Sequence, residues 1–329
     1  MRFIVFGAGA IGSVIAAELS LANEEVGVIA RGEHLAKMRK NGLLYKSIAG
    51  EQRALALEVG TDVEVPAGDV VLVTLKSYAL SAAAPAIRRV CRPESLVVFL
   101  QNGFPWWYFL DLNGRYRDRQ IPSLDPKGLL SSNFARGSIA GGVVTLAASL
   151  LEPGSVQYTA GNNLSIGRPD GHSDIRLSAL SAALSKAGFE VALPGDPRPA
   201  VWTKLVVNVA LNGVAALTGA NIGAIWDDDC LRPLVHQLVE EAEQIASALG
   251  CPINLDLAQR RRSAARTHKS STLQDMEAGR PIEHEALFGA LLSIADEMKL
   301  TVPHIRTVSA LLRRRAIETG CLPSHDLDR

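Results

Sequence analysis

The chain has 329 residues with 34 basic and 34 acidic side chains, so its formal net charge at pH 7 is zero; 47% of the residues are hydrophobic and 21% charged. This length suggests two domains of roughly 100–200 residues each. A neutral chain lacks the surplus of Lys and Arg that binders of nucleic acid or anionic membranes need, and its hydrophobic content excludes a disordered chain.

The cysteines and the N-terminus indicate the compartment. The four cysteines are widely spaced and form no CxxC pair, so we expect free thiols and neither a metal site nor a disulfide framework. Glycines interrupt the apolar N-terminal run, and no stretch of about 18 uninterrupted apolar residues occurs, so neither an export leader nor a membrane span is expected. We therefore predict a soluble, cytoplasmic protein.

The first hundred residues alternate short apolar runs with helical patterns. Strands are predicted at Arg2–Phe6, Glu25–Ala30, Asp69–Leu75 and Ser95–Leu100, and a helix at Gly12–Leu21. Continuous apolar runs such as DVVLVTL are typical of strands covered on both faces. The repetition of strand, helix and strand predicts an α/β fold with a Rossmann-type, doubly wound parallel sheet.

The pattern changes at the proline-rich segment 194–199. Further strands are expected before it, near 141–146, 155–159, 164–167 and 190–193, with turn residues between them. Three prolines in six residues cannot lie inside a helix or a central strand. Helical periodicity then dominates, and helices are predicted near 200–217, 231–249, 254–266, 284–299 and 304–319. We therefore divide the chain into an α/β domain, 1–197, and an all-helical domain, 198–329.

A glycine pattern follows the first predicted strand and opens the first predicted helix. Residues Gly7, Ala8, Gly9, Ala10, Ile11 and Gly12 fit G-x-G-x-x-G. In this context the first glycine permits a tight turn, the second lets the backbone approach a pyrophosphate, and the third allows close packing of helix on strand. The helix N-terminus then offers free N–H groups to the anion. The segment therefore predicts a dinucleotide site.

The end of the second predicted strand indicates which dinucleotide binds. An NAD site usually has an acidic residue there, whereas this chain has Arg31, which can clamp a 2′-phosphate in bidentate fashion. Arg31 favours NADP(H). Glu33 remains a possible acid displaced by two positions, and an Arg on a solvated loop is the simpler alternative.

A polar stripe lies on the first helix of the second domain. Lys204, Asn208 and Asn212 are spaced i, i+4 and i+8, so they share one face of an otherwise apolar helix. Because unpaired buried amides and ammonium groups are costly, this face either meets water or lines a site. Polar residues also cluster at 271–283, where the pattern by itself indicates a loop with a helix N-cap.

These motifs together resemble the ketopantoate reductase (2-dehydropantoate 2-reductase) family over nearly the whole chain. The matching segments are GAGAIG at 7–12, ARGEHLAKMRKNG at 30–42, TLKSY at 74–78, QNG at 101–103, EPGSVQYT at 152–159, KLVVNVALN at 204–212 and STLQDMEAGRPIE at 271–283. The family's fold, a Rossmann domain followed by a helical domain with the active site between them, agrees with the boundary above.

The resemblance also implies roles for individual residues. Lys204 and Glu283 match the family's active-site lysine and glutamate. Asn208, Asn212 and Ser271 match substrate-contacting positions, and Asn102 a residue near both nicotinamide and substrate. Lys76 matches a lysine of the cofactor region, and Arg31 the arginine that binds the 2′-phosphate. The implied reaction is transfer of a hydride from NADPH to the C2 carbonyl of a 2-oxo acid, with Lys204 stabilising the developing charge.

The chain departs from the family pattern after QNG. Five aromatic residues fall within six positions, Phe104, Trp106, Trp107, Tyr108 and Phe109, and open an insertion that reaches about residue 128. It could form an apolar lid beside the substrate, or its tryptophans could pack an elongated loop onto the domain surface. Smaller departures are Tyr158, where many members have His, and His284, Glu285 and Phe288 after Glu283.

We therefore predict an NADPH-dependent reductase of a small 2-oxo acid, with ketopantoate and pantothenate synthesis as the first choice. The alternatives are a more apolar 2-oxo acid, which the aromatic insertion would favour, and a non-catalytic NADP-binding sensor, which the presence of Lys204 and Glu283 opposes. The helical domain could form a homodimer, and no nucleic-acid partner or metal is expected.

Overall fold

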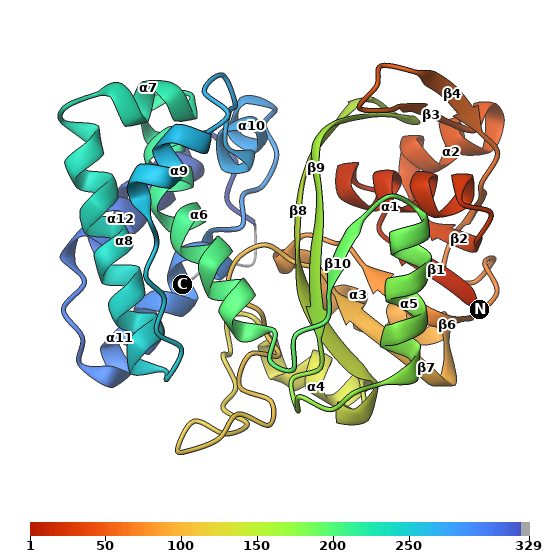
Figure 1. The fold of residues 1–329 in the computed structure, drawn as a ribbon, viewed down its shortest axis with the longest axis horizontal. Coiled ribbons are helices and arrows are strands. Elements are labelled where there is room, and N and C mark those ends of the chain that lie inside the picture. The colour runs from red at the N-terminus through yellow and green to blue at the C-terminus, as the bar shows by residue number, and fades with distance from the viewer. Residues whose placement is uncertain (324–329) are drawn as a thin grey trace. The chain divides into compact units, whose positions relative to one another are not determined.

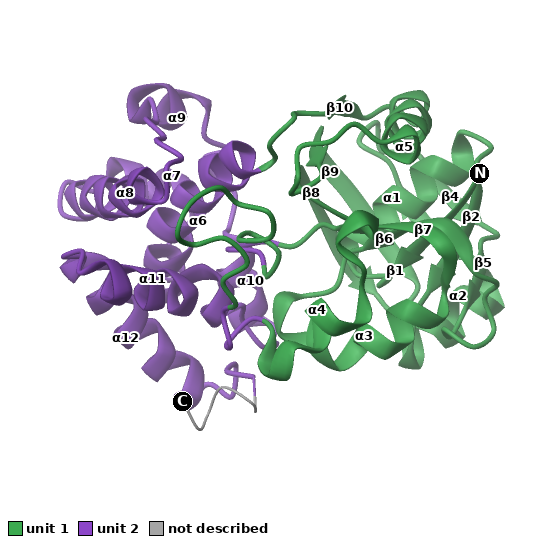
Figure 2. Ribbon diagram, turned by 90° about the horizontal axis from the view of Figure 1, so that it is seen from below, with its two compact units in different colours: residues 1–101, 106–120, 125–197 green, residues 102–105, 121–124, 198–329 purple. Residues whose placement is uncertain are grey.

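The chain folds into two compact units in a computed structural model that describes residues 1–323 (Figure 2). Unit 1 consists of residues 1–101, 106–120 and 125–197. Unit 2 consists of residues 102–105, 121–124 and the chain from Arg198 onward. The chain passes for the last time from unit 1 to unit 2 between Pro197 and Arg198, within the proline-rich segment. Residues 102–105 and 121–124, which the sequence analysis placed in the first domain, belong to unit 2.

Unit 1 is built on a ten-stranded sheet. Its strands are β1 (Arg2–Phe6), β2 (Glu25–Ile29), β3 (Leu43–Lys46), β4 (Gln52–Leu55), β5 (Glu58–Gly60), β6 (Gly68–Val73), β7 (Cys91–Phe99), β8 (Ile139–Glu152), β9 (Ser155–Gly167) and β10 (Glu190–Ala192). Its helices are α1 (Ala10–Leu21), α2 (Gly32–Asn41), η1 (Ser77–Ala79), α3 (Leu80–Arg89), η2 (Pro126–Gly128), α4 (Leu129–Asn133), η3 (Arg136–Ser138) and α5 (Ile175–Lys186).

The strand order is β4-β3-β9-β8-β7-β6-β1-β2-β5, and β10 pairs with β9. Neighbouring strands run parallel along the series β8-β7-β6-β1-β2-β5. The pairs β3/β9 and β10/β9 are also parallel, whereas β3/β4 and β8/β9 are antiparallel. Helices flank the sheet on both faces (Figure 1): α1, α2 and α5 contribute to one core cluster, while α3 packs against β7 and α4. The predicted Rossmann-type, doubly wound α/β fold is confirmed.

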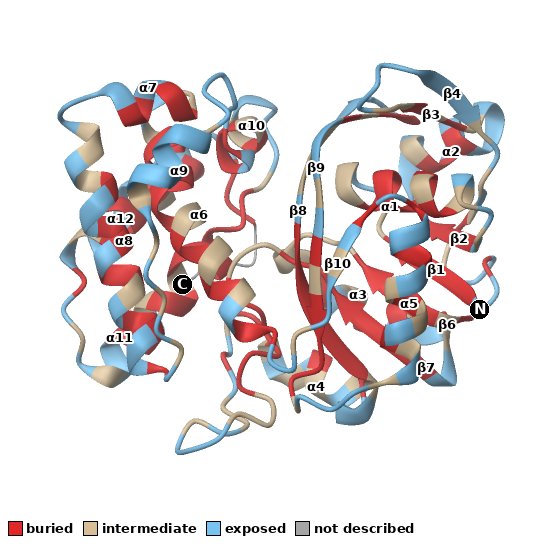
Figure 3. Cartoon of the chain, in the orientation of Figure 1, coloured by how far each residue is buried: buried red, intermediate tan, exposed pale blue. Residues whose placement is uncertain are grey.

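Burial explains why the central strands have no polar face. Val70, Val71, Leu72 and Val73 of β6 are all 0% exposed, because successive side chains point to opposite, equally covered faces of the sheet (Figure 3). The strands predicted near 141–146, 155–159 and 164–167 form instead one long antiparallel hairpin, β8 and β9. Gly161, at φ +73°, lets β9 continue through the expected break, with register shifts in the facing part of β8.

Unit 2 is helical over its described part from Arg198 to Pro323. Its helices are α6 (Arg198–Thr218), α7 (Ile222–Asp227), α8 (Leu231–Ala248), α9 (Leu257–Ser263), α10 (Ser271–Glu277), the π-helix η4 (Glu285–Gly289), α11 (Ala290–Met298) and α12 (Pro303–Glu318). The five predicted helices are present, but α7 and α10 were missed, and the one predicted from 284 to 299 begins as a π-helix. Gly250 and Gly320 follow the C-caps of α8 and α12 with positive φ, as is common where a glycine ends a helix.

Helix α6 is the centre of unit 2. It is long and apolar enough by composition to cross a membrane, with a window of mean hydropathy 1.5, yet 67% of that window is buried inside the protein. It packs against α8, α10 and α12, as expected of the core helix of a bundle.

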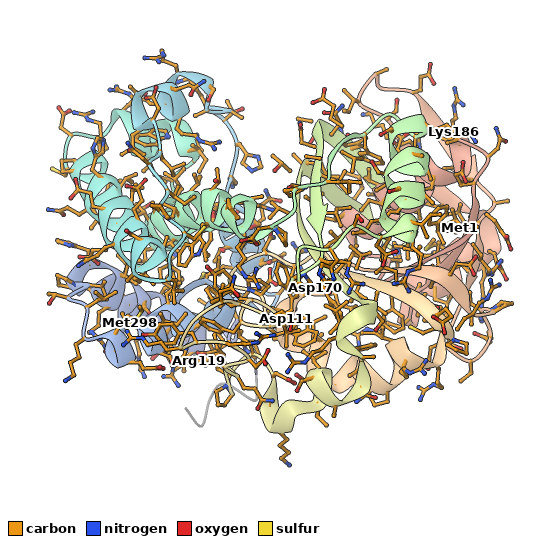
Figure 4. All side chains as sticks on the ribbon, turned by 60° about the horizontal axis from the view of Figure 1, so that its bottom comes forward. Met1, Asp111, Arg119, Asp170, Lys186 and Met298 are labelled. Carbon is orange, nitrogen blue, oxygen red and sulfur yellow. The ribbon has the colours of Figure 1, made fainter. Side chains whose placement is uncertain are left out.

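The five aromatic residues that open the insertion are packed inside the protein, whereas later positions in it, such as Asn113, Arg115 and Arg117, are exposed. Phe104, Trp106, Trp107, Tyr108 and Phe109 are each 7% exposed or less. Within unit 1, the ring of Trp106 meets Phe99 edge-on at 5.1 Å, the ring of Trp107 fills the space where Gly141 lacks a Cβ, and the guanidinium of Arg119, labelled in Figure 4, lies 5.2 Å from the centre of the Phe109 ring. These contacts support the packing interpretation over the lid.

Candidate functional site

The glycine turn of unit 1 lies at the carboxyl end of β1. The N–H groups of Gly7 and Ala8 both donate to the carbonyl of Ile29, at 3.1 and 3.2 Å, which bends the chain across the end of β2. Gly7 has φ +113°, a conformation that L side chains rarely adopt. A Cβ on Gly12 would collide with the carbonyl of Gly7 and the hydroxyl of Thr74, so helix α1 can approach the strand only with glycine there.

Gly9 differs from its two neighbours in the motif. No atom lies within 4 Å of the place where its Cβ would stand, so its backbone faces open space. Gly9 is also the N-cap of α1, no side chain caps this helix, and its first turn holds no acidic residue. The free N–H groups at a helix N-terminus, beside an open stretch of glycine backbone, fit the pyrophosphate of a dinucleotide.

Arg31 begins α2 just beyond β2, at the same edge of the sheet. It is exposed and makes no ion pair with the described residues. A guanidinium in this state is free to bind a phosphate. Glu33, also exposed, lies in the first turn of α2, so both the basic and the acidic candidate are accessible.

Lys76 follows β6, whose carboxyl end pairs with that of β1, because Phe6 lies opposite Val73. The hydroxyl of Thr74 donates to the carbonyl of Gly7 at 2.7 Å and ties this strand end to the glycine turn.

Sequence reasoning missed Gln101, although it belongs to the quoted QNG motif. Its side-chain nitrogen donates to the carbonyl of Val73 at 2.9 Å, which fixes the point where the chain leaves unit 1.

Unit 2 gathers a second group of predicted residues. The ammonium of Lys204, on α6, donates to the side-chain oxygen of Asn102 at 2.6 Å. Asn102 lies in the QNG turn, 102 positions earlier in the chain, and the turn is pressed onto the π-helix η4. Gly103, at φ +83°, leaves no room for a Cβ, which would stand 2.6 Å from the carbonyl oxygen of Ala286. The N–H of Phe104 donates to that same carbonyl at 2.6 Å.

Glu283 directly precedes this π-helix region. It is 6% exposed, and its carbonyl accepts a hydrogen bond from the N–H of Leu287 at 3.1 Å. The structure thus brings Asn102 to Lys204 and places Glu283 three positions before the carbonyl that holds the QNG turn. π-Helical segments are rare and occur frequently at functional sites.

Asn208 and Asn212 continue the polar face of α6. Asn208 is half-buried and Asn212 only 7% exposed, yet neither side-chain amide makes a hydrogen bond within the described residues. Buried amides are normally paired, so these two offer hydrogen bonds that the protein itself does not use.

Ser271 is not brought to this group by any side-chain hydrogen bond within residues 1–323. It is the first residue of α10 and is exposed. The N-cap expected in this segment is its neighbour Ser270, which is 3% exposed and accepts from the N–H of Leu273 at 3.2 Å. Helix α10 packs against α6, so Ser271 lies on an element next to the polar face.

A glycine turn with open backbone after the first strand of a Rossmann-type sheet is typical of oxidoreductases that use a nicotinamide dinucleotide. The family model "Ketopantoate reductase PanE/ApbA" matches residues 3–171, and its C-terminal counterpart matches residues 196–316. The chain belongs to the ketopantoate reductase family.

Individual relatives agree with this assignment. The chain is 34% identical to a 2-dehydropantoate 2-reductase of Mesorhizobium japonicum, with 98% of this chain and 99% of the relative covered. Among solved structures, a candidate ketopantoate reductase from Ralstonia solanacearum is 31% identical with a TM-score of 0.90, covering 98% and 99% of the two chains. The ternary structure of a D-mandelate dehydrogenase with NADH and anilino(oxo)acetate shares the fold at 18% identity, with a TM-score of 0.86 and 97% and 99% covered.

Proposed function

We propose that this protein reduces a small 2-oxo acid with NADPH, and that the acid is ketopantoate, which becomes pantoate in pantothenate synthesis. The observation that carries the proposal is the hydrogen bond from Lys204 to Asn102, which fixes an ammonium group beside the unpaired amides of α6. The open glycine backbone and the free Arg31 of unit 1 support the cofactor.

The reaction needs a cation at the carbonyl oxygen of the substrate. NADPH, when bound, would supply the hydride to C2, and negative charge would develop on the carbonyl oxygen. In the proposed mechanism Lys204 polarises this oxygen, stabilises the charge and donates the proton that completes the hydroxyl group. Its bond to Asn102 holds the ammonium in place before substrate arrives, so little reorganisation is needed during the reaction. Glu283 orients the lysine or holds a substrate hydroxyl.

The remaining predicted residues would bind the ends of the substrate. Asn208 and Asn212 present amides that have no partner within residues 1–323 and suit the distal hydroxyl of ketopantoate. A site built for a hydroxyl rejects analogues that lack it, because its polar groups would then stay unpaired. Asn102 and Ser271 remain proposed contacts of the substrate carboxylate.

The choice of NADPH over NADH rests on Arg31. Its exposed guanidinium has no competing carboxylate partner among the described residues, whereas Glu33 is the one feature nearby that would suit an unphosphorylated ribose. Lys76, at the carboxyl edge of β6, is proposed as a further cofactor contact.

The departures from the family pattern offer little support for a more apolar substrate. Trp107 and Tyr108 are fully buried, Phe288 is 0% exposed, and Tyr158 donates its hydroxyl to the carbonyl of Gly161 within β9. Each of these side chains packs inside the protein, so none supplies an exposed apolar surface. Ketopantoate therefore stays ahead of the bulkier alternative.

A panel of 2-oxo acids with NADPH and with NADH tests the proposal, followed by absorbance at 340 nm. Oxidation of NADPH with ketopantoate, faster than with acids that lack the distal hydroxyl, is the expected result. Absence of turnover with every acid would refute the reductase, and faster turnover with NADH would refute the role of Arg31. Fractionation of cells and light scattering of the purified protein test the proposed cytoplasmic location and homodimer.

A further inference from the structure

Unit 2 contains a buried histidine that the reaction above does not use. His284 is 4% exposed and directly follows Glu283. Its Nδ1 lies 3.3 Å from a carboxylate oxygen of Glu285, and its Nε2 lies 3.2 Å from the carbonyl oxygen of Ser309 on α12 and 3.0 Å from the Ser309 hydroxyl. The Ser309 carbonyl can only accept, whereas its hydroxyl can also donate, so Nε2 can bond Ser309 in either ring tautomer, as a donor to the carbonyl or as an acceptor from the hydroxyl.

The histidine lies beside a close contact between α6, η4 and α12. Its ring stacks on Phe288 with an interplanar angle of 27°. A Cβ on Gly213 of α6 would stand 2.8 Å from the Phe288 ring and 2.7 Å from Val308 of α12. We call Gly213, Phe288 and Val308 the Gly213 junction; it directly follows Asn212 along α6. Any shift of η4 against α12 therefore also disturbs α6 next to a proposed substrate contact.

The same π-helix holds the QNG turn. The carbonyl of Ala286, two residues after His284, accepts the N–H of Phe104, and the turn carries the Asn102 oxygen that accepts from Lys204. A chain of direct contacts thus runs from Ser309 through His284 and η4 to the ammonium of Lys204.

We propose that His284 is a positioning residue: its bond to Ser309 fixes η4 against α12, and η4 in turn holds the Asn102–Lys204 pair. The kinetic part of this inference rests on the proposed reductase function. Misplacing a catalytic group by about 1 Å can cost about 100-fold in rate. An apolar side chain would fill the same space but would make no hydrogen bond to Ser309.

Removal of the ring tests the proposal by kinetics and by hydrogen exchange. We expect His284→Ala to lower kcat about 10- to 100-fold, while KM for the 2-oxo acid changes less than about threefold. The Phe104 amide, measured by NMR or mass spectrometry, should exchange at least about tenfold faster, because its acceptor on η4 is no longer held. The exchange measurement needs no substrate, so it judges His284 even if the native protein reduces none of the acids and the proposed function fails.

His304→Ala is the matched control. His304 also lies in unit 2 and bonds a carboxylate, with its Nδ1 2.6 Å from Glu241, but this partner belongs to α8 and not to η4 or the QNG turn. This variant should leave kcat and the exchange of the Phe104 amide unchanged. Equal effects of the two substitutions would reduce His284 to a general stabiliser and overturn the proposal, as would unchanged exchange in His284→Ala.

Two conservative variants complete the test, and they decide it if His284→Ala does not fold. His284→Gln can place an amide N–H near the position of Nε2, whereas His284→Asn places one near Nδ1, toward Glu285. We expect Gln to restore kcat and Phe104 protection to within about threefold of the native values and Asn to restore neither, because the Ser309 contact crosses between helices. Equal behaviour of the two variants, or better rescue by Asn, overturns the proposal.

Discussion

The glycine turn of unit 1 and the polar face of α6 in unit 2, which we propose as the cofactor and substrate sites, are built in opposite ways. The turn works by omission: Gly7 and Gly12 let the backbone pack where a Cβ would not fit, and Gly9 leaves space beside free N–H groups. The face of α6 works by addition, since Lys204 and Asn212 place polar atoms on a helix whose other faces are apolar. The comparison teaches that backbone geometry can serve a pyrophosphate, whereas stabilising charge on one atom needs a side chain held by another segment.

The largest effect is expected at Lys204, whose removal should stop catalysis at the polar face of α6 while the glycine turn still binds the cofactor. Lys204→Ala should lower kcat at least about 100-fold, because the developing oxyanion loses its cation and its proton donor. The dissociation constant of NADPH, measured by fluorescence titration, should stay within about threefold of the native value. Turnover close to native would remove Lys204 from the mechanism, and loss of NADPH binding would show that the two regions do not act separately.

Substitution of Arg31 tests whether the cofactor site at the glycine turn also needs a side chain. Arg31→Ala should lower kcat/KM for NADPH about 10- to 100-fold, which corresponds to the loss of charge-assisted hydrogen bonds of about 1.5–3 kcal/mol. The same variant should change kcat/KM for NADH less than about threefold, because NADH has no 2′-phosphate. Equal losses of kcat/KM with NADPH and NADH would contradict the assignment. Glu33→Ala is the control, and it should not lower kcat/KM for NADPH.

Substitutions of Gly9 and Gly12 should distinguish the residue that the turn needs for stability from the one it needs for cofactor binding. Gly12→Ala should lower the free energy of unfolding by about 1–3 kcal/mol, since the new Cβ collides with the Gly7 carbonyl and the Thr74 hydroxyl. Gly9→Ala meets no atom within 4 Å and should leave stability within about 0.5 kcal/mol of native, yet raise the dissociation constant of NADPH about tenfold. Urea unfolding and cofactor titration measure both quantities; unchanged binding in Gly9→Ala would place the pyrophosphate elsewhere.

The glycine turn could be predicted from the sequence because its physics is local. The spacing of Gly7, Gly9 and Gly12 between a strand and a helix already specifies which Cβ atoms must be missing. The apolar strands and the stripe on α6 were predictable for the same reason, since periodicities of 2.0 and 3.6 residues depend only on neighbours.

The polar face of α6 and its surroundings were only partly predictable from the sequence. The sequence placed Lys204 on a polar stripe, but its partner Asn102 comes from a turn 102 positions away, a contact that only the fold creates. The π-helix η4 escaped prediction because it retains the apolar spacing of an ordinary helix. The cap of α10 was expected in its segment but falls on Ser270, and the hairpin of β8 and β9 replaced separate strands because Gly161 carries the strand through a break signal.

Asn212 gives the smallest but most selective test, because binding and stability should change in opposite directions. Asn212 is 7% exposed and its amide has no hydrogen-bond partner among the described residues, so burial removes most of its hydration and a ligand can supply the hydrogen bonds that are lost. Asn212→Leu has a similar volume and should raise the free energy of unfolding by about 1 kcal/mol.

The same substitution should raise KM for the 2-oxo acid about three- to tenfold, the value of one neutral hydrogen bond. Asn208→Leu is the matched control: Asn208 is half-buried, so water already solvates part of its amide, and the variant should weaken binding without the gain in stability. Thermal unfolding and steady-state kinetics of both variants decide the matter. A loss of stability in Asn212→Leu would mean that the amide serves the fold, and α6 would then resemble the glycine turn, whose residues are fixed by packing as well as by the ligand.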